Sequence, residues 1–350
     1  MQKKKIHVEI LRTIAIYFVM FNHTGGFFYF AKSIDDPLYY FYMSVSVLCK
    51  VAVPVFFMIT GALLLKKEET LKTLITKRIL KFSLILVTIS LFYYLLLNRN
   101  WSVTDFAEKV YSTNITTGLW YLYSYIGILF MLPILRKLVK NLTEKEYLYI
   151  FICHLLFVGV VPILEYLIWQ GEVTLNNNFS TMLFTINNVY YVLLGYYCEN
   201  ILDIKKITSK NIAYGILLSL IAIAVSCCMT NYKINIIGTE DNNALESFFS
   251  SLISIPSFTL YVVFRKLCAK EIPQRVEMFI AEIGGSVFGA YLFEKLIRMV
   301  TAFVYGGFNK IIGPFWASIV WVGAGMTFGL VIITLLKKIP FIGKYIRMVI

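Results

Sequence analysis

The sequence predicts an all-α fold, a polytopic helical bundle embedded in a membrane. Hydrophobic residues make up 59% of the 350 residues and charged residues only 15%, whereas soluble domains are nearer half apolar and a quarter charged. The mean hydropathy is +0.73, and several separate apolar runs exceed the roughly 18 residues that indicate a membrane-spanning helix. The runs do not alternate as barrel strands do, so the helix is the only backbone structure that suits them.

Ten apolar runs predict about ten membrane-spanning helices. The first run follows three lysines and lacks a small-residue cleavage site, so we expect it to stay as a helix. The connections 98–118, 170–182 and 231–244 are the longest, and none is long enough for a soluble domain; residues 1–350 are therefore predicted to form a single integral membrane domain. In chain order the expected spans cover residues 6–30, 44–65, 79–97, 119–135, 147–169, 183–200, 211–230, 245–267, 278–304 and 313–336.

Basic residues are concentrated in alternate connections. Of the 33 Lys and Arg residues, 24 fall in the two tails and in the connections on the same side as the N-terminus, and eight fall on the opposite side. Cytoplasmic loops carry such an excess, so both termini are predicted to be cytoplasmic and the protein to lie in the cell (inner) membrane as a multi-pass protein. The net charge of +13 follows this topology and indicates contact with membrane lipid, not with nucleic acid.

The cysteines and the sequence motifs give no sign of a metal site, a disulfide framework, a Ser-His-Asp triad or a phosphate-binding loop. The six cysteines lie singly or as one adjacent pair, without metal-ligand spacing or a disulfide framework, so no metal is expected. No Ser-His-Asp order and no glycine-rich phosphate loop after a strand is evident. Two of the three histidines, His7 and His154, fall near the cytoplasmic boundary, where we expect solvated or interfacial side chains.

The first predicted helix carries an arginine and a histidine on one face. His23 follows Arg12 by eleven residues, which at about 100° per residue returns to within about 20° of the same direction, about 16 Å further along the axis. Charged and titratable groups in a membrane usually face a bundle interior or a wet cavity. Two plainer interpretations stay open: Arg12 reaches the cytoplasmic headgroups, and His23 makes an ordinary hydrogen bond at the far helix end.

Short motifs follow in a fixed order along nearly the whole chain. Arg12 and His23 are followed in the second span by Pro54-Val55-Phe56-Phe57-Met58-Ile59-Thr60-Gly61. Together they resemble the Arg-x10-His and Pro-x-Phe-Phe-x-x-Ser-Gly signatures of the acyltransferase 3 family of membrane acyltransferases, with Thr60 where Ser is usual. Further similar segments are Leu119-Trp120-Tyr121-Leu122 with Pro133, Tyr190 to Tyr196, and Ile283 to Leu292.

This resemblance implies an O-acetyltransferase with acetyl-CoA as cytoplasmic donor and a sugar hydroxyl as acceptor. Within the family the chain most resembles the ten-helix surface-polysaccharide O-acetyltransferases without an extra domain, such as the one that acetylates enterobacterial common antigen. The acceptor is then a glycan of the cell surface or its lipid-linked precursor. The alternative is a polysaccharide exporter of the same family that transfers no acyl group, and dependence on acetyl-CoA separates the two.

The chemistry of acyl transfer indicates roles for the two residues of the first helix. Moving an acetyl group from a thioester to a hydroxyl needs a base that works near neutral pH, which histidine supplies, and donors for the developing oxyanion. His23 is the candidate base, or alternatively a transiently acetylated nucleophile. Because Arg12 is about 16 Å away, we expect it to position the donor.

Further candidates lie on the two sides of the membrane. The donor's phosphates need a basic entrance, for which Lys77, Arg78 and Lys81 are candidates; this segment resembles the family's basic pair, although the same residues suit anionic lipid. On the acceptor side the weaker candidates are Asn22, Trp120, Glu165 and Glu294. Trp120 also suits an interfacial aromatic belt, and Glu294 stands where the family often has His and is expected to pair with Arg298, four residues on.

Overall fold

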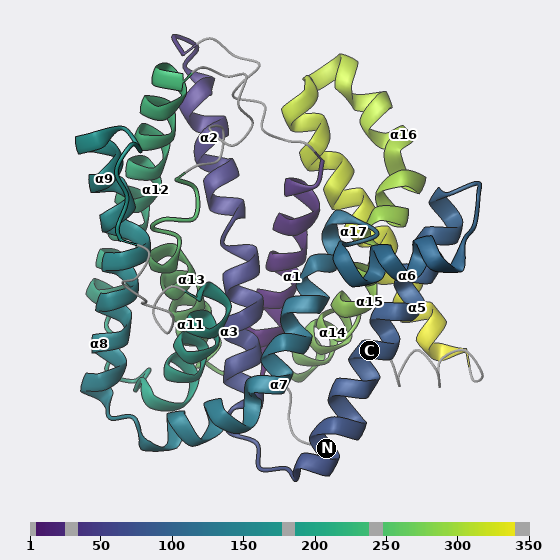
Figure 1. Ribbon diagram of the computed structural model, residues 1–350, viewed down its shortest axis with the longest axis horizontal. Helices are drawn as coiled ribbons and strands as arrows, with labels where there is room; N and C mark the ends of the chain where they lie inside the picture. Colours follow the sequence, from purple (N-terminus) through teal and green to yellow (C-terminus); the bar gives the residue numbers. More distant parts are fainter. Residues whose placement is uncertain (1–4, 25–33, 177–185, 238–247, 340–350) are drawn as a thin grey trace.

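The computed structural model describes residues 5–24, 34–176, 186–237 and 248–339, and these residues form helices and connections without a strand (Figure 1). The helices are α1 (Ile6–Asn22), α2 (Leu38–Cys49), α3 (Ala52–Leu64), α4 (Leu71–Leu74), α5 (Leu80–Leu97), α6 (Val103–Ser112), α7 (Trp120–Asn141), α8 (Glu144–His154), α9 (Val161–Trp169), α11 (Asn187–Tyr196), α12 (Ser209–Ile237), α13 (Ser254–Leu267), α14 (Gln274–Gly284), α15 (Val287–Leu292), α16 (Glu294–Ile312) and α17 (Pro314–Lys338). Short π-helical turns (Ile75–Ile79, Leu155–Val160, Tyr197–Ile201) and one 3₁₀ turn (Thr117–Leu119) continue or precede them.

The prediction of a polytopic membrane bundle is confirmed. Within the described ranges, six stretches are long and apolar enough to cross a membrane, and they match the second to fifth, the seventh and the tenth predicted spans: Leu38–Leu64, Leu71–Leu97, Thr117–Asn141, Glu144–Trp169, Ser209–Asn235 and Pro314–Lys338. Parts of the first, sixth and eighth predicted spans lie outside the described residues, so the count of ten stays a prediction.

The ninth predicted span is broken. We expected one helix over 278–304, but α15 ends at Leu292 and α16 begins at Glu294, and the helical stretches on either side of Phe293 are bent by 94°. Backbone groups freed at such a break must find partners inside a membrane protein. The buried Tyr93 hydroxyl donates to the Leu292 carbonyl (3.1 Å) and accepts from the Leu296 N–H (3.4 Å). The break therefore places Glu294 at a corner inside the bundle.

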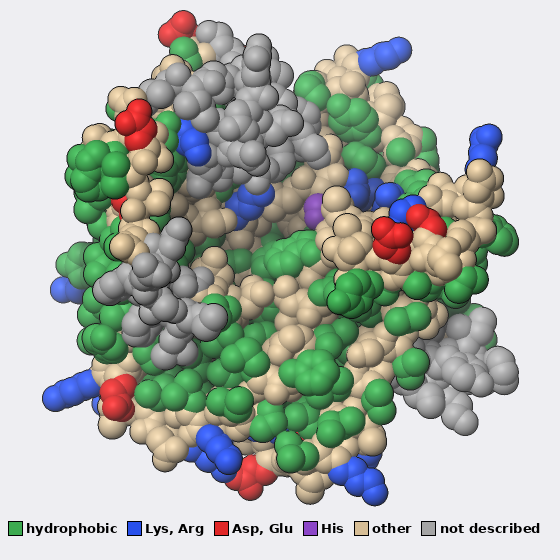
Figure 2. Space-filling model, in the orientation of Figure 1, with side chains coloured by type: hydrophobic (Ala, Val, Ile, Leu, Met, Phe, Trp, Pro, Cys, Tyr) green, Lys and Arg blue, Asp and Glu red, His purple; other side chains and the backbone are tan. Residues whose placement is uncertain are grey.

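Helix α1 lies at the centre of the bundle beside α3, with α8, α9 and α12 on one side and α5, α6 and α16 on the other (Figure 1). Its apolar residues Leu11, Ile16 and Met20 are fully buried. In Figure 2 apolar side chains are most prominent in the lower half of the face, and charged side chains lie along its lower edge and in its upper half. A helix buried this completely holds its few polar residues against other protein segments, not against lipid.

Helices α3 and α11 pack backbone to backbone through two glycines. A Cβ at Gly61 would lie 1.8 Å from the Val192 carbonyl oxygen, and one at Gly195 would lie 1.9 Å from that of Met58. Small residues allow such close approach, which is a principal source of helix association in membranes. This close contact sets the relative position of α3 and α11, and both helices contribute residues to the cavity described below.

The start of α1 and the end of α17 meet at the same turn. A Cβ at Gly284 would lie 2.3 Å from Glu9 Oε2 in the first turn of α1, and Lys337 near the end of α17 donates to the Gly285 carbonyl. The first turn of α1 and the last turn of α17 thus lie on the same side of the bundle. Their location in the cytoplasm stays a prediction.

Candidate functional site

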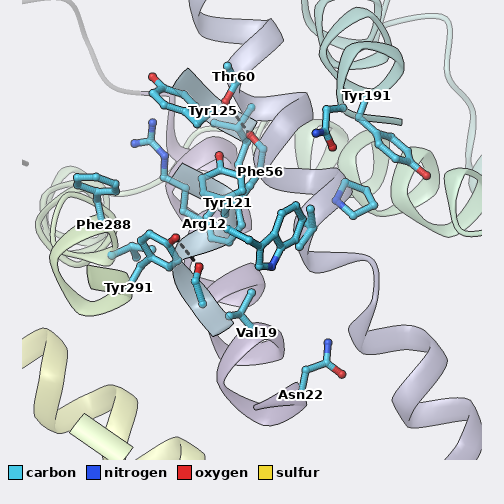
Figure 3. A pocket seen from close by; sticks show the side chains of 18 of the residues that line it. Arg12, Val19, Asn22, Phe56, Thr60, Tyr121, Tyr125, Tyr191, Phe288 and Tyr291 are labelled. Carbon is cyan, nitrogen blue, oxygen red and sulfur yellow. Dashed lines mark hydrogen bonds between the residues drawn. The ribbon is translucent and has the colours of Figure 1, made fainter. Parts of the chain in front are cut away.

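A cavity of about 1480 Å³ lies between α1, α3, α7, α11, α14 and α15. Arg12 and His23 both line it, so the shared helix face expected from their spacing opens onto one space. In Figure 3, Arg12, Val19 and Asn22 follow one another along α1, and Tyr121 and Tyr291 face the same space. The side chain of Arg12 is therefore part of the cavity wall.

His23 is held at the end of α1 beside a buried carboxylate. Its backbone N–H donates to the Val19 carbonyl (3.1 Å), and its Nδ1 lies 3.3 Å from Oε2 of Glu294, whose side chain is 6% exposed. This is ion-pair distance, although Nδ1 makes no contact of full hydrogen-bond geometry. Long contacts of this kind are common in catalytic sites without substrate and tighten when it binds.

Arg298 connects the two members of this pair. Its guanidinium donates to the Glu294 carboxylate, which confirms the expected pair of residues four apart, and it also donates to the backbone carbonyl of His23. The buried charge of Glu294 is therefore balanced, and the end of α1 is fastened to the first turn of α16. Sequence spacing indicated the Glu294–Arg298 pair but gave no sign that His23 joins it.

The turn before α7 packs against the edge of the His23 ring. The Tyr291 hydroxyl donates to the Gly118 carbonyl (2.7 Å; dashed in Figure 3), and a Cβ at Gly118 would lie 3.5 Å from His23 Cε1. Gly118 and Trp120 both line the cavity. Because residue 118 is a glycine, no side chain projects from it toward the imidazole, and Trp120 follows two residues later in the chain.

Arg12 has a carboxylate partner of its own. Its Nη1 donates to both oxygens of Glu9, at 2.9 and 3.2 Å, while its side chain is 30% exposed on the cavity. Glu9 is buried and pressed against Gly284. The pair lowers the local charge but leaves part of the guanidinium open to a bound anion.

Aromatic side chains form the wall near Arg12. Phe56, Tyr121, Tyr125, Phe288 and Tyr291 all line the cavity (Figure 3). Tyr121 stacks on Tyr125 with ring centroids 6.2 Å apart and meets the edge of Tyr291 at 5.7 Å. This part of the cavity is a rigid, largely apolar passage.

A cluster of cations surrounds Glu69, in the connection before α4. Glu69 accepts from Arg78 Nε (2.8 Å) and from Arg136 Nη2 (2.8 Å). Burial opposes ionisation, but the hydrogen bonds from Arg78 and Arg136 hold the pKa of Glu69 below its usual value. Burial, and then the charges of Arg78, Arg136 and Arg12, lower the pKa of Lys67. Arg136 was missed from the sequence, where it looks like any other cytoplasmic basic residue.

The other two basic candidates take different positions. Lys77 is exposed on the π-helical turn Ile75–Ile79. Lys81 Nζ lies 5.6 Å from the centroid of the Phe82 ring, and Phe82 lines the cavity. The structure thus brings Arg78 into the Glu69 cluster. Lys81 lies beside the cavity residue Phe82 without lining the cavity itself, and Lys77 belongs to neither group.

Among the acceptor-side candidates, the structure separates Glu165 from the rest. Asn22 and Trp120 line the cavity and Glu294 contacts His23. Glu165 is not part of the lining; its Oε1 accepts the backbone N–H of Leu175 (2.7 Å) and so fastens the connection after α9. The hydrogen bond gives Glu165 a structural role, and its acceptor-side role stays a prediction.

Comparison with known proteins assigns the chain to a family. Neither curated proteins nor solved structures gave a match. The model of the acyltransferase domain family, however, matches residues 6–338, nearly the whole chain and all the site residues described above. The chain therefore belongs to the acyltransferase 3 family of membrane acyltransferases.

Proposed function

We propose that this protein transfers an acetyl group from cytoplasmic acetyl-CoA to a hydroxyl of a cell-surface polysaccharide or its lipid-linked precursor. The observation that carries the proposal is the cavity shared by Arg12 and His23, with Glu294 behind the histidine. A buried carboxylate in this position orients an imidazole and stabilises the imidazolium that forms when the ring takes a proton.

His23 acts as the general base in the proposed reaction. With Nδ1 directed at Glu294, Nε2 is the nitrogen that takes the proton of the acceptor hydroxyl. The hydroxyl oxygen bonds to the thioester carbonyl carbon, the carbon–sulfur bond breaks, and the proton passes from His23 to the leaving sulfur. The products are the acetyl ester and free CoA. A positioned base of this kind contributes about 10²–10⁴ in rate.

The inner part of the site suits the donor. CoA carries several phosphate charges, and the arginines of the Glu69 cluster, Arg78 and Arg136, have the forked geometry that binds phosphate. We propose that Lys67 and Lys81 add charge at this entrance and that Arg12 positions the donor arm. The aromatic passage beyond Arg12 accommodates the uncharged pantetheine chain.

The size of the cavity supports direct transfer between two bound substrates. Its volume of about 1480 Å³ exceeds the range of about 300–1,000 Å³ typical of small-molecule pockets. Donor arm and acceptor can therefore occupy it together. We propose direct transfer in this ternary complex and not an acetylated His23.

The test is transfer of radiolabelled acetyl from acetyl-CoA in isolated membranes that contain the protein. We expect label to appear on a glycan with the wild-type protein and to be lost with His23→Ala. Arrival of polysaccharide on the far side without acetyl-CoA and without label would replace the proposal with the exporter alternative.

A further inference from the structure

We propose that Asn187, Asn188 and Trp120 form the subsite that binds the sugar part of the acceptor. This inference rests on the proposed function, and it adds two asparagines that were not candidates in the sequence analysis. All three side chains line the same cavity as His23. The expected ligand is an uncharged, hydroxyl-rich sugar ring.

The polar groups of these side chains are not used by the fold. Neither the amides of Asn187 and Asn188 nor the indole N–H of Trp120 makes a hydrogen bond with the described part of the chain. Other amides do: Asn231 bonds to the hydroxyls of both Tyr39 and Tyr40. Asn187 is exposed and Asn188 is half-buried on the cavity wall, so both amides are free to bond a polar occupant.

Asn187 and Asn188 project from the first turn of α11. Tyr191 lies three and four residues after them, which on a helix is the same face, and Tyr191 also lines the cavity. In Figure 3 Tyr191 stands across the cavity from Arg12 and Phe288. The asparagines therefore belong to the wall opposite the aromatic donor passage.

Trp120 links this wall to the reacting centre. It lies two residues after Gly118, where an added Cβ would lie 3.5 Å from His23 Cε1, and its side chain is partly exposed on the cavity. An indole offers a flat apolar face to the C–H side of a sugar ring and one N–H donor to a hydroxyl. A sugar seated on Trp120 would bring a hydroxyl near His23 while the asparagines hold its other hydroxyls.

The chemistry of the three groups matches hydroxyls better than it matches phosphates. An amide has two donors and two acceptor sites, and a hydroxyl is both donor and acceptor. Each asparagine can therefore either donate a hydrogen bond to a sugar hydroxyl or accept one from it. Phosphates accept only, and the cations that suit them lie at the Glu69 cluster. The cations that suit the donor phosphates thus lie outside the cavity lining, whereas the two amides are part of it.

The test separates acceptor binding from donor binding. We would compare Asn187→Ala/Asn188→Ala, Trp120→Phe and the control Asn141→Ala, an exposed asparagine that bonds the Lys137 carbonyl away from the cavity. The readouts are acetyl-CoA binding by purified protein and the rate of labelled acetyl transfer to endogenous glycan in membranes. We expect the double variant to bind acetyl-CoA as the wild type does but to transfer at least tenfold more slowly, Trp120→Phe to lose less, and the control to lose nothing.

Each other outcome overturns the inference. Transfer at the wild-type rate by the double variant would show that the acceptor binds elsewhere, and weakened acetyl-CoA binding in a monodisperse variant would assign these residues to the donor site. If the double variant does not fold, Asn188→Ser alone gives the same comparison. Absence of label with the wild-type protein would instead overturn the proposed function, and the subsite with it.

Discussion

Two histidines lie at opposite ends of helix α1, His7 in its first turn and His23 directly after its last residue. Each contacts a buried glutamate, but the two pairs differ in their surroundings. His7 Nε2 lies 2.8 Å from Glu199, which also binds Lys5 Nζ (2.8 Å) and the Tyr261 hydroxyl (2.8 Å). His23 Nδ1 lies 3.3 Å from Glu294, without hydrogen-bond geometry, and its ring lines the cavity. The first pair is saturated by the fold, whereas the second leaves one face of the imidazole to a ligand.

The same two residue types thus form a saturated structural pair at one end of α1 and, in the proposed function, the reacting pair at the other. Glu199 joins α1 to α13 and to the end of α11, so its hydrogen-bonding capacity is used within the protein. Glu294 stands at the broken helix beside Arg298 and keeps only a loose contact with His23. The following predictions test this contrast.

Exchange of the two histidines for alanine should have the largest and most divergent effects. His23→Ala should reduce acetyl transfer by about 10²–10⁴, the range of general-base catalysis, with little change in thermal stability. His7→Ala should lower the thermal midpoint and protein yield while the folded fraction keeps its turnover. If both variants lost the same fraction of turnover per folded molecule, the assignment of a structural role to His7 and a catalytic role to His23 would be wrong.

The two carboxylates should respond in the same divergent way. Glu294→Gln should lower kcat about 100-fold with an unchanged KM for acetyl-CoA, because the amide cannot stabilise the imidazolium. Glu199→Gln should instead destabilise the fold, since loss of one partner of a buried ion pair costs about 3–5 kcal/mol. Glu165→Gln, a partly buried carboxylate away from the cavity, is the control for activity.

Removal of the Arg298 guanidinium should reduce turnover, because Arg298 holds Glu294 and the end of α1 in place. Arg298→Met should lower kcat about tenfold through misplacement of Glu294 and the end of α1, because one lost charged contact is worth roughly 1.5–3 kcal/mol. Arg298→Lys, which keeps the charge, should restore part of that loss. A purely structural role would reduce the amount of folded protein without this rescue of kcat.

At the donor entrance, Arg78→Ala should raise the KM for acetyl-CoA about tenfold and leave kcat nearly unchanged, because a lost phosphate contact affects binding of the ground state and transition state alike. The control is Arg275→Ala, an exposed arginine at the start of α14. A change in kcat alone would place Arg78 outside the donor site.

The smallest effect should be the acid dependence of the Glu69 cluster. The pKa of Glu69 is lowered from its ordinary value of 4.5, so its pairing stabilises the protein above that value and is lost as the pH falls through the lowered pKa. Thermal midpoints of wild type and Glu69→Gln should therefore converge in acid and differ at neutral pH. A constant difference at all pH values would contradict this.

The sequence predicted what depends on local spacing. The six long apolar runs and the common face of Arg12 and His23 follow from residue order alone. The break at Phe293 did not, because it is stabilised by Tyr93, about 200 residues away in the chain. His7 and His154 were expected at a solvated boundary, and this was wrong: His7 is paired with Glu199, and His154 is buried and stacked on Tyr190 with ring centroids 3.4 Å apart.

The partner of His23 could not be predicted from residue spacing either. Glu294 could be paired with Arg298 by spacing, but its contact with His23 joins residues 271 positions apart through the bend after α15. The Glu69 cluster likewise depends on Arg136 from α7. Only these tertiary contacts show that Glu294 lies beside His23 and that Arg78 and Arg136 share Glu69.

The most direct test of the account is the release of CoA by purified wild-type protein from acetyl-CoA before any acceptor is added. If His23 is a base that acts on a bound acceptor, no burst of CoA should appear until glycan is supplied, and acid-quenched protein should carry no acetyl group. A stoichiometric burst, with acetyl recovered on His23, would contradict direct transfer.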